Sequence, residues 1–157
     1  MACEHRQRIS LHYKPFLAVT QLADVVGNQT VFWIVRHAAY NSLENSTYKL
    51  QLPTTRGSFS IPTLQGSLSL NGRDSKIHVT DYDLGSSWKV LYSSGEILTW
   101  KRFSSNTIIV IYGFDGKTHG TAFVVPPGAG SDVYVLRGDA LVNSLVSTKD
   151  GVVTISY

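Results

Sequence analysis

A chain of 157 residues falls within the size range of one domain, and 43% hydrophobic with 16% charged residues is the composition of a globular protein. The net charge of +3 comes from 14 basic and 11 acidic residues without blocks of one sign, so there is no electrostatic footprint for nucleic acid or anionic lipid. The single cysteine, Cys3, excludes an internal disulfide, and no run approaches the roughly 20 apolar residues of a membrane span. We therefore expect no metal, cofactor, nucleic-acid or membrane partner.

The first residues of the chain show no strand pattern and no apolar run of signal-peptide length. We predict an extension of uncertain order over residues 1–18 and one β-domain over residues 19–157. Two glycosylation sequons, at Asn28 and Asn45, have meaning only in a secreted protein. We expect both asparagines to lie on exposed loops or strand edges.

From Val31 onward the chain consists of short apolar runs with a period of two, and no window has the 3.6-residue period of a helix. In residues 47–52, Tyr48, Leu50 and Leu52 share one face, which predicts a strand with one wet side. Three continuous β-branched and aromatic runs instead predict strands covered on both faces. These runs are 31–37, 107–112 and 121–125.

Turn signals separate these runs at intervals of about 8–12 residues, which is typical of a sandwich or barrel. They include the "NG" at Asn71, "DLGSS" from Asp83 and "KDG" from Lys149. The predicted fold class is therefore all-β, an antiparallel β-sandwich-like domain of many short strands with little or no helix.

The stretch "LNGRDSKIHVTDYDLG", residues 70–85, contains the densest cluster of charged residues. Strand geometry would place Asp81 and Asp83 on one face with Cβ atoms roughly 6.5–7 Å apart, a spacing found in glycosidase carboxylate pairs. An aspartate beside "LGSS" is also what turn chemistry predicts, because its side chain accepts backbone hydrogen bonds there. We favour the turn, and keep a small hydrolase using this pair as an alternative.

Arg73 and Asp74 lie in the five-residue loop "NGRDS", which predicts a hairpin between the strands on either side. We expect both residues, like Asp81 and Asp83, to fix turns or to dock against a neighbouring domain. His78 has no second histidine or cysteine at ligand spacing, so the sequence predicts no metal site.

Aromatic residues offer an alternative site. Trp88, Tyr92 and Trp100 lie on neighbouring predicted strands, and a row of exposed rings could stack on sugars. Tryptophan is, however, highly buried on average, so we favour a core position for these residues.

Four segments match a known family in order and spacing. "VRHAAYNSLENSTYKLQLPTT", "GSLSLNGRDSKIHVTDYDLG", "LYSSGEILTWKRF" and "IIVIYGFDGKTHG" closely resemble the second domain of the β-galactosidases of glycoside hydrolase family 35, especially the fungal ones. From Thr121 to Tyr157 the resemblance is looser, and it implies a domain truncated at its C-terminal end, so that the chain could be a fragment, a relic or a free-standing module.

The resemblance implies an all-β module beside a catalytic TIM barrel in secreted enzymes that remove terminal β-D-galactosyl residues. The catalytic glutamates of the family lie on the barrel, and none of Glu4, Glu44 and Glu96 lies in such a motif. We therefore expect an inactive, non-catalytic accessory domain that braces a barrel in cis, and an extracellular location although this chain has no signal peptide. The alternative is a free-standing carbohydrate-binding module for galactosides that uses Trp88, Tyr92 and Trp100.

Overall fold

A computed structural model describes residues 16–23, 27, 29–63, 66–104, 106–114, 117, 119–126 and 145–157. These residues form strands joined by turns, and no helix occurs among them, which confirms the all-β class. It follows that no described segment is a helix able to cross a membrane. The strands are β1 (Leu17–Ala23), β2 (Val31–His37), β3 (Asn45–Tyr48), β4 (Leu50–Thr54), β5 (Gly57–Ile61), β6 (Leu68–Asn71), β7 (Ser75–Gly85), β8 (Trp88–Ser93), β9 (Glu96–Arg102), β10 (Thr107–Tyr112), β11 (Gly120–Val124), β12 (Leu145–Lys149) and β13 (Val152–Ser156).

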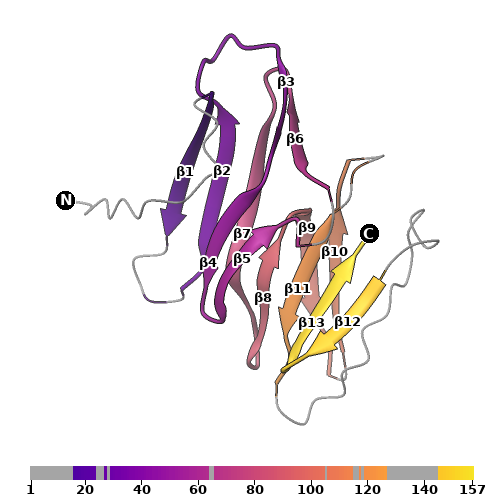
Figure 1. Cartoon of the computed structure of the whole chain (residues 1–157). Helices are drawn as coiled ribbons and strands as arrows, with labels where there is room; N and C mark the ends of the chain where they lie inside the picture. Colours follow the sequence, from indigo (N-terminus) through magenta and orange to yellow (C-terminus); the bar gives the residue numbers. More distant parts are fainter. Residues whose placement is uncertain are drawn as a thin grey trace.

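A seven-stranded antiparallel sheet forms the centre of the domain, with the strand order β1-β2-β7-β8-β11-β13-β12. Three further strand pairs, β3–β6, β4–β5 and β9–β10, lie outside this sheet. In Figure 1, β4 and β5 cross in front of the sheet, whereas β9 and β10 lie behind β11 and β13. We refer to β3–β6 and β4–β5 as the front layer and to β9–β10 as the back layer.

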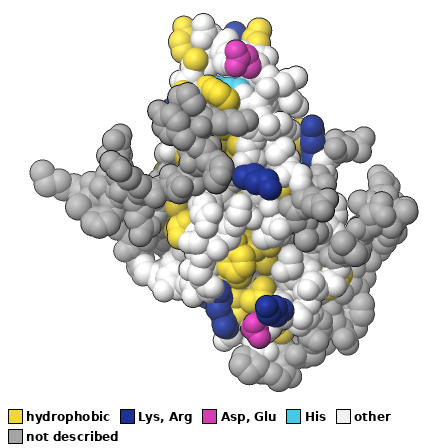
Figure 2. Space-filling model, viewed as in Figure 1, with side chains coloured by type: hydrophobic (Ala, Val, Ile, Leu, Met, Phe, Trp, Pro, Cys, Tyr) yellow, Lys and Arg dark blue, Asp and Glu magenta, His cyan; other side chains and the backbone are white. Residues whose placement is uncertain are grey.

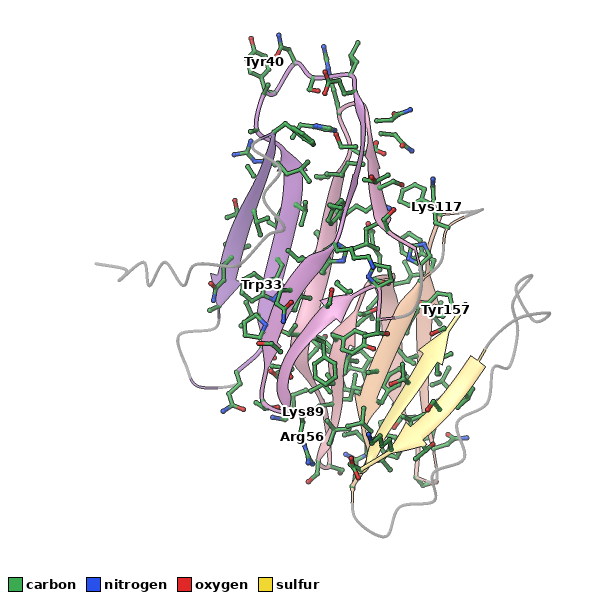
Figure 3. All side chains as sticks on the ribbon, viewed as in Figure 1. Trp33, Tyr40, Arg56, Lys89, Lys117 and Tyr157 are labelled. Carbon is green, nitrogen blue, oxygen red and sulfur yellow. The ribbon has the colours of Figure 1, made fainter. Side chains whose placement is uncertain are left out.

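The front layer packs on the half of the sheet that contains β1, β2, β7 and β8. Its alternating residues Tyr48, Leu50 and Leu52 are buried, as the period of two predicts. They pack with Trp33 and Val35 of β2 in one hydrophobic cluster. Trp33, labelled in Figure 3, projects from β2, and its indole N–H donates to the Thr80 hydroxyl at 3.1 Å.

The back layer packs on the opposite face of the sheet, over β7, β8, β11 and β13. Val90 of β8 and Phe123 of β11 are buried there against Ile97, Trp100 and Ile109 of the back layer. Each face of the sheet is thus covered over only part of its width by the described strands, and the two covered parts are offset.

Two of the three continuous apolar runs are covered on one face only, contrary to the prediction. In β2, exposure alternates so that Trp33 and Val35 are buried while Phe32 remains 38% exposed. Exposure alternates in β10 as well, because its outward residues have no described layer above them. Only the run in β11 is buried on both faces, since Ala122 packs in the front cluster and Phe123 packs beneath the back layer.

The predicted hairpin across residues 70–75 is wrong. β6 pairs with β3 in the front layer, whereas β7 pairs with β2 and β8 in the central sheet. The turn signal is present, with Gly72 at a φ of +55°, but the chain uses it to pass from one layer to another. The turns between β7 and β8 and between β12 and β13 do close hairpins, the latter with Asp150 and Gly151 both at positive φ.

The predicted extension over residues 1–18 lies largely outside the described residues. Leu17 and Ala18 belong to β1, where they pair with His37 and Arg36.

Candidate functional site

Asp81, the first of the candidate carboxylates, holds two layers of the domain together. Its side chain is buried, and its two oxygens accept hydrogen bonds from the Thr55 backbone N–H, at 2.9 Å, and from the Thr55 hydroxyl. Thr55 lies in the turn between β4 and β5, so these bonds fasten the front layer to β7. Both carboxylate oxygens are therefore occupied within the domain.

Asp83 points to solvent and stabilises a turn. Its Oδ1 accepts the Gly85 N–H at 2.7 Å at the end of β7, just before the turn into β8. Asp81 is buried while Asp83 is exposed, so the prediction that they share one face is wrong. The reason is local, because Asp81 has a φ of +51° and this left-handed backbone breaks the alternation of an extended strand.

Asp74 lies in a turn between β6 and β7. Its N–H donates to the Asn71 carbonyl at 3.1 Å, and its Oδ2 accepts the Asn71 N–H at 3.4 Å. Arg73 beside it is exposed. The contacts of Asp74 are those of a turn, and a docking role for Arg73 and Asp74 stays a prediction.

The three candidate sugar-stacking rings do not form an exposed row. Tyr92 is only 1% exposed, bonds to the Thr63 hydroxyl at 3.0 Å and packs on Phe59, so it cannot stack on a sugar. Trp88 of β8 and Trp100 of β9 are partly buried in the core between the central sheet and the back layer. The indole N–H of Trp100 donates to the Tyr82 hydroxyl at 3.2 Å, which further ties the back layer to β7.

Sequence reasoning missed a buried polar stripe on β7. Lys76, His78 and Thr80 are all buried, whereas Ile77 between them is 48% exposed. The stripe faces the front layer, where the His78 Nε2 lies 2.9 Å from the Tyr48 hydroxyl. The sequence shows the alternation of polar and apolar residues in this strand, but it suggests that the apolar face, which includes Ile77, is the buried one.

Burial controls the protonation of this stripe. It lowers the pKa of His78 to about 3, with a smaller contribution from the nearby Lys76 ammonium, and it raises the pKa of Tyr48. The pKa of Lys76 is also lowered by burial, against the charges of Asp74 and Glu96. His78 is therefore a neutral imidazole at ordinary pH, enclosed by the core.

A small cavity adjoins this stripe between β7 and the end of β10. Lys76 and His119 line it, together with Glu96, Tyr112 and Phe114. The Lys76 ammonium lies 4.4 Å from the centre of the Phe114 ring, and His119 stacks on Tyr157 at 5.8 Å. The Glu96 carboxylate accepts the Tyr112 hydroxyl. These groups stabilise one another rather than surround an open substrate pocket.

A shallow groove runs along the front between β5 and the β12–β13 hairpin. Phe59 and Val152 contribute apolar surface to it, and Arg56, Lys149 and Asp150 contribute charge. In Figure 2 hydrophobic and basic side chains lie side by side on this front face. Among the described residues, no group of three His, Cys, Asp or Glu side chains could hold a metal ion.

One of the two sequon asparagines lies among the described residues. Asn45 begins β3 with an exposed side chain. Asn28 lies outside the described residues. Glycosylation of either stays a prediction.

Comparison with known proteins identifies the family. The family model described as "Beta-galactosidase, domain 2" matches residues 4–156, nearly the whole chain. The chain belongs to this family. The resemblance seen in the four sequence segments is thereby confirmed.

Fungal β-galactosidases are among the relatives of this β-galactosidase domain 2. The β-galactosidase A of Aspergillus niger is 45% identical over 138 residues, which are 87% of this chain and 13% of the relative. The probable β-galactosidase A of Aspergillus flavus is 44% identical over 136 residues, or 86% of this chain and 12% of the relative. That of Emericella nidulans is 48% identical over 104 residues, 66% of this chain and 10% of the relative. The chain thus spans only a small part of the curated relatives it matches.

Proposed function

We propose that this domain is a non-catalytic accessory module of a β-galactosidase that docks to a TIM-barrel catalytic domain in the same polypeptide and braces it. The observation that carries the proposal is the use of the acidic residues. Asp74, Asp81 and Asp83 all bond to groups of this domain, in turns or between layers.

The chemistry of glycoside hydrolysis supports a catalytic site elsewhere. A retaining enzyme needs a nucleophilic carboxylate and an acid/base carboxylate about 5 Å apart on either side of the scissile bond. Here Asp81 is buried with both oxygens occupied, Asp83 is exposed in a turn, and Glu96 accepts a bond from Tyr112. None of these carboxylates has the environment of a catalytic pair.

The size of the relatives supports a partner in cis. The matching region is only 12% of the A. flavus relative and 13% of the A. niger relative, which leaves ample chain for a catalytic domain. The exposed sequon at Asn45 and the secreted enzymes that the resemblance implies support an extracellular glycoprotein.

An exchange of domains tests the proposal. The matching region of the A. niger enzyme would be replaced by this chain in one protein and by a short Gly/Ser linker in another. We expect the chimera to hydrolyse a chromogenic β-galactoside and to keep this activity on heating, and the linker version to lose soluble, heat-stable activity. A linker version as active and stable as the parent enzyme, or an inactive chimera, would contradict a bracing role.

A further inference from the structure

One half of the back of the central sheet carries an exposed apolar surface. The cross-strand register opposes Leu22 to Phe32 and Ile34 to Ile77, so these four side chains from β1, β2 and β7 lie on one face. Leu22 is 53% exposed, and Phe32 and Ile77 are exposed as well. We call Leu22, Phe32, Ile34 and Ile77 the open face.

The open face differs from scattered surface hydrophobics because its members are neighbours and, among the described residues, no charged side chain lies between them. The next pair in the register, Thr20 with Ile34, adds only a hydroxyl, and the first charge along β2 is Arg36. Contiguous apolar surface of this kind marks a protein interface.

The open face also adjoins the flank of the back layer. The Phe32 ring meets Tyr82 edge to face with ring centres 6.2 Å apart, and the Tyr82 hydroxyl accepts the Trp100 indole N–H from β9. A surface packed on the open face would therefore lie beside β9, in line with the layer that covers the other half of the sheet. In Figure 1, β9 and β10 lie behind β11 and β13, away from β1 and β2.

We propose that the open face docks an apolar surface of the catalytic domain in the same polypeptide, an inference that rests on the proposed function. We choose the catalytic domain as the partner because the relatives contain several times more residues than the region that matches this chain. The choice follows as well from charge, since a face without ions is complementary to an apolar partner and not to a charged one.

The experiment compares two double variants that change equally exposed apolar residues. Leu22→Lys/Ile77→Lys places two charges on the open face. The matched control, Leu98→Lys/Val110→Lys, places two charges on the outer side of the back layer, where these residues are 68% and 41% exposed. Each pair is made in the isolated chain, where circular dichroism reports folding, and in the chimera with the A. niger enzyme, where heat inactivation of β-galactosidase activity reports docking.

We expect both variants to fold as isolated chains, because the altered side chains are already exposed. In the chimera, the open-face variant should shorten the half-life of activity at an inactivating temperature by about tenfold or more, and the control by less than about twofold. If lysine on β1 and β7 prevents folding of the isolated chain, Leu22→Thr/Ile77→Thr removes the apolar surface with a residue that favours strands.

Equal half-lives of the two chimeric variants, or a greater loss in the control, would overturn the assignment of this face. A dimer of the isolated chain in sedimentation that the open-face variant disperses would overturn it too, by assigning the face to a second copy. Failure of the proposed function itself is seen separately, as a wild-type chimera no more stable than the linker version.

Discussion

The two halves of the back of the central sheet have similar apolar side chains and opposite environments. On the half covered by β9 and β10, Val90 and Phe123 are buried in a hydrophobic cluster. On the open face, Phe32 and Ile77 are exposed although they are equally apolar. An apolar strand face in the sequence therefore predicts that another layer packs on it. Which part of the sheet that layer covers depends on where the chain places its next strands.

The largest effect should come from the covered half. Phe123→Ala removes a ring buried beneath the back layer, and we expect a loss of about 3–5 kcal/mol in the free energy of unfolding, because transfer and cavity terms add. Urea denaturation followed by tryptophan fluorescence measures it. A loss below about 1 kcal/mol would mean that β9 and β10 do not form a core with the sheet.

Removing the Asp81 carboxylate should have the second largest effect. Asp81→Ala abolishes both hydrogen bonds to Thr55. It also puts alanine at a positive φ, which alanine tolerates less well than aspartate. We therefore expect a loss of about 2–4 kcal/mol in the free energy of unfolding. Asp83→Ala is the control, because it removes one exposed turn bond worth about 1 kcal/mol or less. Similar losses in the two variants, measured by denaturation, would show that the front layer is not fastened through Asp81.

The pH dependence of stability should report the buried stripe on β7, the strand common to both halves. The pKa of His78 is about 3 in the folded state and ordinary in the unfolded state, so the unfolded state binds a proton first as the pH falls. Stability is thus complete above pH of about 6.5 and declines toward pH 3, by about 2 kcal/mol between pH 6.5 and 5.

The burial-lowered pKa of His119 acts in the same direction. His78→Gln cannot take up a proton, and should flatten the part of the profile that His78 causes. An unchanged slope in the His78→Gln variant, in chemical denaturation at several pH values, would exclude His78 as its source.

The smallest effect should come from the open face of the isolated chain. Ile77→Ala removes a half-exposed side chain without leaving a cavity, so we expect a loss of less than about 1 kcal/mol. A loss comparable to that of Phe123→Ala, in the same urea series, would mean that a part of this chain already covers Ile77.

Much of the local structure was predictable from the sequence. The alternation of Tyr48, Leu50 and Leu52 placed their buried face correctly, because a half-covered strand imposes a period of two. The turns after Asp83 and Lys149 were also predictable, since each turn signal supplies a glycine, Gly85 or Gly151, that the structure holds at positive φ.

The pairing of strands was not predictable in the same way. The signal at Asn71 and Gly72 indicates a reversal of the chain, but β6 and β7 enter different layers because their apolar faces are buried by different partners. The environment of the acidic residues was missed for a related reason. The positive φ of Asp81 arises where β7 ends its pairing with β2, which no local pattern reveals.

The most direct test of the central claim, that the charged residues of this domain hold its fold and catalyse nothing, is an assay of the isolated chain. Rigorously purified chain would be incubated with a chromogenic β-galactoside, beside the variants Asp81→Asn and Asp83→Asn. We predict background rates in all three. Turnover by the wild-type chain that is lost in either variant, with the fold intact by circular dichroism, would contradict the account and place an active site in residues 70–85.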